Sequence, residues 1–135
     1  MRVLADTHAL YWYLISPDRL SPRSLEVLGQ AEDSDGIAVS ALTIPELWVS
    51  VSRKRGDRAI PRSGYEIVRS ALLDPETALD VVPLDTSAWR HFEALPASIS
   101  DPTDGLIVST AQALGVPLVT KDGRITGARV VEFIW

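Results

Sequence analysis

The chain contains no cysteine and no apolar run that approaches the length of a membrane span. The absence of cysteine excludes disulfide bonds and zinc sites with thiolate ligands, and it fits a reducing, cytoplasmic location. A transmembrane helix needs about 20 consecutive apolar residues, so we expect no contact with a membrane. Positive charge is also scarce, because 18 acidic against 13 basic side chains give a net charge of −5. Binding of nucleic acid by net charge alone is therefore excluded.

The composition is that of an ordinary folded domain. Of the 135 residues, 46% are hydrophobic and 23% are charged, which excludes a disordered chain. Single domains cluster at roughly 100–150 residues, and no repeat or linker-like stretch divides this sequence. We therefore expect one domain over residues 1–135.

Short apolar runs that favour strands alternate with segments of helical periodicity. Strands are predicted at residues 2–6, 37–40, 78–84, 116–120 and 129–134, and helices at residues 7–15, 21–31, 42–53, 61–73, 86–95 and 101–115. Asp122 and Gly123 are expected to form a turn. This alternation predicts an α/β domain with a mainly parallel sheet of four or five strands, flanked by helices.

Five carboxylates are expected at one edge of this sheet. Ligands of open parallel sheets bind beyond the carboxyl ends of the strands. Asp6 ends the first predicted strand, and Glu46 lies near the start of the helix after the second. Asp101 and Asp104 open the helix before the fourth strand, and Asp122 follows that strand. The order of elements thus brings all five to the same edge.

Each of these acids also has a purely structural interpretation. Asp101 and Asp104 suit the first turn of a helix, where a carboxylate caps backbone N–H groups. Asp122 suits a turn before glycine, and Glu46 suits a solvated helix surface. Asp6 is the hardest to explain in this way, since a carboxylate at the end of an apolar strand is poorly solvated and needs a partner.

A cluster of carboxylates predicts a bound cation. Without one, neighbouring carboxylates repel each other and take up protons. Ligation by oxygen alone selects a hard divalent ion, Mg²⁺ or Mn²⁺, over zinc. Such an ion activates water and stabilises charge that develops on phosphorus. The residues therefore suggest a Mg²⁺-dependent enzyme that acts on phosphate esters.

Four segments resemble the PIN-domain ribonucleases, and more closely the VapC-type toxins of type II toxin–antitoxin pairs. They are residues 4–10 (LADTHAL), 40–46 (SALTIPE), 101–107 (DPTDGLI) and 118–122 (LVTKD). Residues 130–135 resemble the final strand of the family, so the resemblance covers essentially the whole chain. It implies a PIN-like fold, an RNA substrate, a cognate antitoxin and a homodimer. It also implies cleavage products with a 5′-phosphate and a 3′-hydroxyl.

The resemblance also implies roles for individual residues. Asp6, Glu46, Asp104 and Asp122 would form the catalytic site, supported by Asp101 and by the Thr120 hydroxyl. Asp6, Asp104 and Asp122 would hold Mg²⁺, for which Mn²⁺ can substitute. Glu46 would orient or deprotonate the attacking water. The chain departs from the family at Thr103 and Gly105, where the family often has an aromatic residue and an arginine.

Basic residues are concentrated in one segment. Residues 53–69 contain six basic and two acidic side chains, a net charge of +4. Arg53, Lys54, Arg55 and Arg58 are candidates for contact with RNA or a partner. The alternative is a solvated helix surface.

Aromatic and histidine side chains receive no catalytic role. Tyr11, Trp12 and Trp48 are expected to pack in the core, although the resemblance suggests an antitoxin groove that would use such side chains. His8 is expected to face away from Asp6, and His91 to lie on a helix surface.

Three other functions are possible for an α/β domain with an aspartate at the end of its first strand. A haloacid-dehalogenase-like phosphatase would have a second aspartate at position 8, where the chain has His8. A receiver domain would have paired acids near its N-terminus, and these are absent. A PIN-like module that has lost catalysis and acts by binding remains the alternative.

Overall fold

A computed structural model describes residues 1–54, 56 and 59–135. The described residues form one sheet in which all pairings are parallel and the strand order is β3-β2-β1-β4-β5. The strands are β1 (Val3–Ala5), β2 (Ile37–Ser40), β3 (Leu79–Val82), β4 (Leu118–Val119) and β5 (Phe133–Ile134). The predicted α/β class with a parallel sheet of four or five strands is confirmed.

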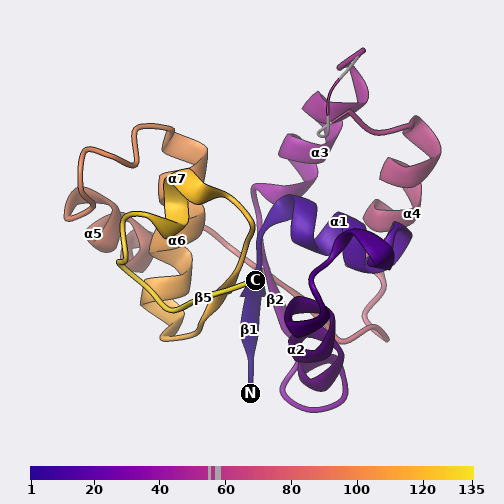
Figure 1. Ribbon diagram of the computed structural model, residues 1–135, viewed down its shortest axis with the longest axis horizontal. Coiled ribbons are helices and arrows are strands. Elements are labelled where there is room, and N and C mark those ends of the chain that lie inside the picture. The colour runs from indigo at the N-terminus through magenta and orange to yellow at the C-terminus, as the bar shows by residue number, and fades with distance from the viewer. Residues whose placement is uncertain (55, 57–58) are drawn as a thin grey trace.

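Helices cover both faces of the sheet (Figure 1). On one face lie α1 (Thr7–Ile15), α2 (Pro22–Glu32), α3 (Thr43–Val51) and α4 (Arg62–Leu73), with a short 3₁₀ turn, η1 (Pro17–Arg19), after α1. On the other lie α5 (Thr86–Glu93), α6 (Pro102–Leu114) and α7 (Gly123–Thr126). No helix among the described residues is long and apolar enough to cross a membrane.

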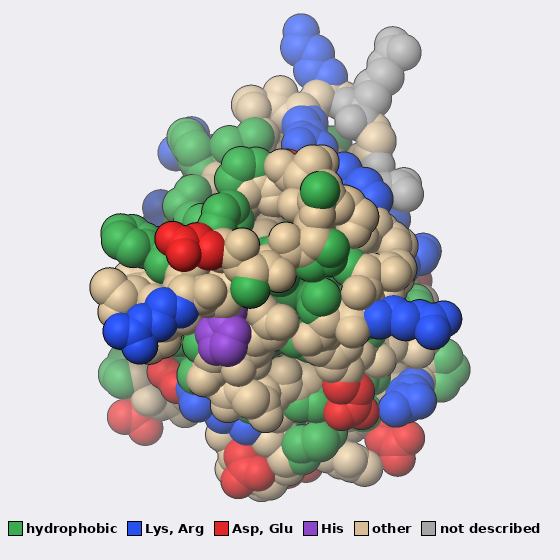
Figure 2. All heavy atoms as spheres, turned by 90° about the vertical axis from the view of Figure 1, so that its left-hand side faces the viewer, with side chains coloured by type: hydrophobic (Ala, Val, Ile, Leu, Met, Phe, Trp, Pro, Cys, Tyr) green, Lys and Arg blue, Asp and Glu red, His purple; other side chains and the backbone are tan. Residues whose placement is uncertain are grey.

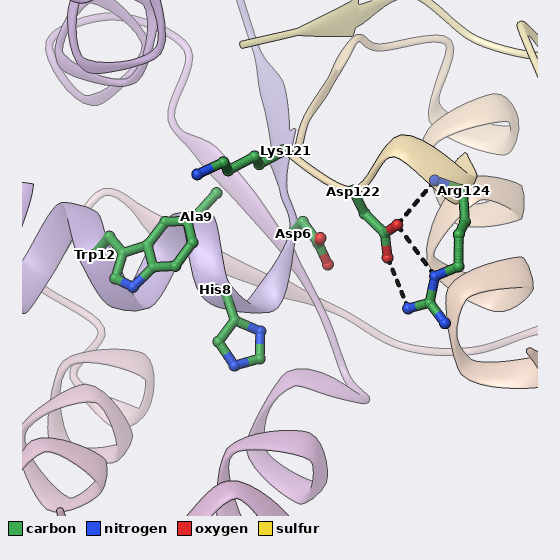
Figure 3. A pocket seen from close by; sticks show the side chains of 7 residues that line it. All are labelled: Asp6, His8, Ala9, Trp12, Lys121, Asp122 and Arg124. Atoms are coloured by element: carbon green, nitrogen blue, oxygen red, sulfur yellow. Dashed lines mark hydrogen bonds and ion pairs between the residues drawn. The ribbon is translucent and has the colours of Figure 1, made fainter. Parts of the chain in front are cut away.

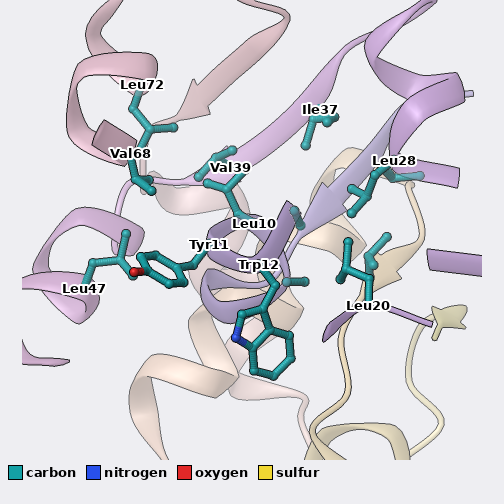
Figure 4. Close-up of a cluster of buried hydrophobic side chains, with 14 of the residues drawn as sticks. Leu10, Tyr11, Trp12, Leu20, Leu28, Ile37, Val39, Leu47, Val68 and Leu72 are labelled. Carbon is teal, nitrogen blue, oxygen red and sulfur yellow. The ribbon is translucent and has the colours of Figure 1, made fainter. Parts of the chain in front are cut away.

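Alternation along the strands divides the core into two layers. In β1, Val3 and Ala5 join the core under α1 to α4, whereas Leu4 joins the core under α6. Successive side chains of a strand point to opposite faces, so a strand buried on both sides is apolar throughout. Tyr11 and Trp12 lie in the larger core (Figure 4), as expected. The expectation that Trp48 also packs in the core is wrong: Thr43, Leu47 and Ser50 form the buried side of α3, and Trp48 is 49% exposed.

The end of the chain differs from the sequence-based prediction in two places. The expected turn at Asp122 and Gly123 is wrong, since Asp122 caps α7 by accepting the Arg124 backbone N–H at 3.0 Å. The strand predicted over residues 129–134 shortens to Phe133–Ile134. Arg129 has a φ of 52°, which lies in the left-handed region and is incompatible with an extended strand.

Candidate active site

The acidic residues lie where the sheet reverses its order. After β1 the chain adds β2 and β3 on one side, and β4 and β5 on the other. Asp6 directly follows β1, and Thr120 directly follows the neighbouring β4. The Asp6 backbone N–H donates to the Val119 carbonyl at 3.0 Å, which joins the two strand ends. Crevices at such reversal points are where open α/β sheets bind ligands.

Both carboxylate oxygens of Asp6 are held in place. Oδ1 accepts the backbone N–H of Thr7 at 2.8 Å, which caps α1. Oδ2 accepts the Thr120 hydroxyl at 2.8 Å. The same Thr120 oxygen accepts the backbone N–H of Asp122 at 3.1 Å. Thr120 therefore links Asp6 to the loop that carries Asp122.

Glu46 is tied to Asp6 through one intervening residue. It lies in the first turn of α3, and its Oε1 accepts the Thr7 hydroxyl at 2.9 Å. Thr7 is fully buried, and its backbone N–H holds Asp6. Thr7 was not predicted as a site residue from the sequence. Its position directly after Asp6, the aspartate that follows β1, could have indicated its role.

Asp104 lies in the first turn of α6, and its surroundings raise its pKa. Asp101 caps α6 by accepting the backbone N–H groups of Thr103 and Asp104 at 2.8 and 3.2 Å. This cap places Asp104 in the first turn, with its side chain only 11% exposed. Burial, followed by the negative charges of Asp101, Asp122 and Asp6 in that order, raises the pKa of Asp104 to about 6. The structure therefore brings these carboxylates together, as the sequence predicts.

Arg124 lies between two of the acids and was not identified from the sequence. Its Nε and Nη2 donate to the Asp122 carboxylate at 3.3 and 3.1 Å (Figure 3). Nη2 also lies 3.7 Å from Asp104 Oδ2. The guanidinium opposes the rise in the pKa of Asp104. Arg124 follows Asp122 by two residues, and the short helix α7 directs its side chain toward the acids.

Two hollows flank the cluster, and His8 lines both. The first, about 280 Å³, includes Asp6, Trp12 and Asp122 in its lining, and the second, about 270 Å³, includes Glu46, Asp101 and Asp104. The expectation that His8 faces away from Asp6 is wrong, because both side chains line the first hollow (Figure 3). The helix begins directly after Asp6, and its first turn carries His8 along the same edge.

The basic segment is only partly described. Arg53 lines the second hollow, and Lys54 is exposed. Arg55 and Arg58 lie outside the described residues. Figure 2 shows Lys and Arg side chains at the top of the molecule, the end where α3 and α4 lie in Figure 1. On the rest of that face, charges of both signs are interspersed.

Gly105 lies where α5 packs closely on α6. It is buried, and a Cβ atom at this position would lie 2.8 Å from Cε2 of Phe92. Any larger residue would therefore displace the Phe92 ring. This contact explains the glycine where the resemblance suggests arginine, and Arg124 supplies a guanidinium to the acids from a different element.

The acids suit a hard cation held partly by water. Among the described residues, no three carboxylate or imidazole groups as placed are grouped so as to hold a metal ion. Mg²⁺ in proteins commonly uses only one or two carboxylates, with water in its remaining positions. Asp104 and Asp122 share one guanidinium, and the first of them carries a raised pKa. The predicted metal ligands Asp104 and Asp122 therefore lie where a nearby positive charge stabilises their carboxylates.

The fold and the acidic edge are those of a known class of protein. The family model for the PIN domain matches residues 3–130. The chain therefore belongs to the PIN-domain family. Ribonuclease VapC22 of Mycobacterium tuberculosis is 35% identical to it over 133 residues, which cover 94% of this chain and 92% of that protein. The sequence-based assignment to the PIN-domain ribonucleases of the VapC type is confirmed.

Solved structures of low sequence identity share the fold. VapBC2 from Rickettsia felis, bound to a DNA fragment from its promoter, has a TM-score of 0.67 at 15% identity and covers 99% of this chain and 98% of its own. VapBC-5 from Mycobacterium tuberculosis, a toxin–antitoxin system, has a TM-score of 0.62 at 18% identity, with coverage of 98% and 97%.

Proposed function

We propose that this PIN-domain protein is the toxin of a toxin–antitoxin pair, and that it hydrolyses RNA phosphodiester bonds with Mg²⁺ at Asp6, Glu46, Asp104 and Asp122. Its class as a VapC-type ribonuclease rests on the family match and on the 35% identity to Ribonuclease VapC22. The observation that supports the residue assignment is the convergence of these acids at the reversal point of the sheet.

Each residue has a distinct task in the proposed reaction. Asp6 and Asp104 would be the most direct ligands of Mg²⁺, with Mn²⁺ as a substitute, and Asp122 would hold the ion directly or through water. The bound ion lowers the pKa of a coordinated water and stabilises negative charge on the phosphate. Thr120 keeps Asp6 Oδ2 in a fixed direction. Asp101 supports the site by capping the helix that carries Asp104.

Glu46 is the proposed general base. The Thr7 hydroxyl fixes its Oε1, which leaves the carboxylate oriented at the rim of the acidic cluster. A carboxylate in this place accepts a proton from the attacking water while the P–O bond to the leaving 3′-oxygen breaks. The leaving oxygen takes up a proton, and the products carry a 5′-phosphate and a 3′-hydroxyl.

The test is metal-dependent cleavage of RNA. The purified chain is incubated with RNA and Mg²⁺ or Mn²⁺ beside the variants Asp6→Asn and Asp104→Asn. Asp85→Asn is the matched control, because Asp85 caps α5 away from the acidic cluster. Cleavage that requires metal, survives in the control and is lost in both site variants supports the proposal. Cleavage that persists in EDTA, or equal cleavage rates in all proteins, would contradict the proposal. No cleavage by the wild-type chain would leave the alternative of a module that acts by binding.

The proposed partners are an antitoxin, a second copy of the chain and RNA, in the cytoplasm. Structural neighbours of this fold were solved as VapBC toxin–antitoxin systems, which supports an antitoxin partner. Large apolar side chains on α3 and α4, namely Trp48, Val49 and Ile67, are about half exposed and suit a protein surface that becomes covered. Arg53, Lys54, Arg55 and Arg58 remain candidates for RNA or partner contact.

Expression in cells tests the toxin role separately. Production of the chain is expected to arrest growth, and co-production of the protein encoded by the neighbouring gene is expected to relieve the arrest. Continued growth in cells that contain the active enzyme would contradict the toxin role but not the proposed ribonuclease activity.

A further inference from the structure

We propose that the hollow beside Asp6 is a subsite for one nucleotide of the RNA. Lys121 and Arg124 contact its phosphate, and Trp12 and His8 form the wall against its sugar and base. This inference rests on the proposed ribonuclease function and adds to it the place of a nucleotide that flanks the cleaved bond. These four side chains and Asp6 line the same hollow (Figure 3).

The size of the hollow suits one nucleotide. Its volume is about 280 Å³, just below the range of about 300–1,000 Å³ found for small-molecule sites. Asp6 and Asp122 lie in its lining, so a nucleotide here is directly next to the carboxylates that act on the phosphodiester bond. A longer stretch of RNA would have to extend beyond the hollow.

Two cations lie at the hollow on either side of Asp122. Lys121 is exposed, and its Nζ lies 6.0 Å from the ring centroids of both Trp12 and Trp135, which places the ammonium group near the aromatic wall. The Arg124 side chain is 65% exposed although Nε and Nη2 contact Asp122. A guanidinium offers five N–H donors, so it can hold Asp122 and contact a phosphate together.

The wall of the hollow is aromatic and fixed. Trp12 packs edge-on against Trp135 at 5.8 Å between centroids, and the His8 ring lies 6.2 Å from that of Trp12. Trp12 and His8 are each less than 10% exposed, so the surrounding core holds them in position. Aromatic surface beside cations is the combination by which proteins bind single-stranded nucleic acid.

The second hollow has a different character. Glu46, Asp101 and Asp104 line it, against one cation, Arg53, among its described lining residues. In the first hollow two acids are matched by two cations. A phosphate is repelled less in the first hollow, and aromatic surface is found there as well. The first hollow is therefore the better nucleotide site.

Binding of adenosine 5′-monophosphate tests the inference without requiring cleavage, since this probe has no phosphodiester bond. The probe is titrated in Mg²⁺ buffer while the indole N–H resonances of the four tryptophans are followed by NMR. Trp12 and Trp135 are expected to shift and saturate. Trp48 and Trp89, which are 49% and 59% exposed on α3 and α5, serve as internal controls for non-specific contact.

Variants and a second probe assign the contacts. Lys121→Gln and Arg124→Gln are each expected to weaken binding about three- to tenfold, as for loss of a partly exposed charged contact. Arg23→Gln, an exposed change on α2, is the matched control and is expected to have no effect. Inorganic phosphate is expected to bind more weakly than the nucleotide, because it cannot use the aromatic wall.

Three results would overturn the subsite. They are shifts confined to Trp48 and Trp89, equal affinity for phosphate and nucleotide, and unchanged affinity in both site variants. RNA cleavage without nucleotide binding at Trp12 would overturn the subsite and leave the proposed function. Nucleotide binding without any RNA cleavage would support the subsite and contradict the proposed ribonuclease function.

Discussion

Asp104 should destabilise the metal-free protein at neutral pH. Burial, and after it the charges of the neighbouring acids, raise the pKa of this carboxyl from its ordinary value of 3.8 to about 6. The charged form of Asp104 at neutral pH therefore lowers the free energy of unfolding of the protein. Asp104→Asn removes the charge, keeps the shape of the side chain, and is expected to raise the free energy of unfolding at pH 7.5 in EDTA.

The magnitude follows from the pKa. A rise from 3.8 to about 6 corresponds to about 3 kcal/mol, at about 1.4 kcal/mol for each tenfold change in the acid constant. The amide introduced by Asp104→Asn also loses some solvation, so we expect a net gain of about 1–3 kcal/mol. Because the folded-state pKa is raised, the folded protein binds more protons between about pH 4 and 6. The contribution of Asp104 to the free energy of unfolding of the wild-type protein therefore falls as the pH rises from about 4 to 6.

Urea unfolding at two pH values is the assay. The free energy of unfolding of Asp104→Asn should exceed that of the wild type at pH 7.5, and this difference should be largely absent at about pH 4. At about pH 4 the raised pKa keeps Asp104 protonated in the folded protein, and the pH is close to the pKa of Asp104 in the unfolded chain. Asp85→Asn, which changes another helix-start carboxylate away from the site, should show no such difference. A variant that is equally stable or less stable than wild type at pH 7.5 would refute the reasoning.

Three further changes are expected to have measurable effects. Gly105→Arg should lower the free energy of unfolding by about 1–3 kcal/mol in urea melts, and the loss should shrink in a Phe92→Ala background, since the new Cβ meets that ring. Thr120→Val, which removes the hydroxyl donated to Asp6, should lower the cleavage rate at saturating Mg²⁺ roughly tenfold, whereas Thr120→Ser should retain it. Glu46→Gln keeps the side-chain shape but removes the base, so single-turnover cleavage should fall about 10²–10⁴-fold with the fold unchanged by circular dichroism. A Glu46→Gln rate near that of wild type would assign the base elsewhere.

The strands and the placement of the acids were predictable because both follow from local patterns. Val3, Leu4 and Ala5 form an apolar run that suits a strand buried on both faces, and parallel strands bring their carboxyl ends to one edge. Asp6 follows that run directly. The position of Asp104 followed from the helical period and from the cap at Asp101.

The contacts among side chains were not predictable in the same way. Arg124 reaches Asp104 across 20 positions, and its approach depends on α7, a helix of four residues that carries little periodic signal. The direction of the His8 ring depends on where α1 begins relative to β1, and a difference of one residue rotates a side chain by about 100°. Such contacts follow from packing between elements distant in the sequence.

The nature of the cleaved RNA ends tests the central claim most directly. Cleavage of an RNA in H₂¹⁸O with Mg²⁺, followed by mass spectrometry of the products, shows which oxygen attacked the phosphorus. Hydrolysis by water at the acidic cluster predicts ¹⁸O in a new 5′-phosphate, a 3′-hydroxyl on the other fragment, and no products from Asp6→Asn. A 2′,3′-cyclic phosphate formed equally well in EDTA would mean attack by the ribose 2′-hydroxyl and would contradict the account.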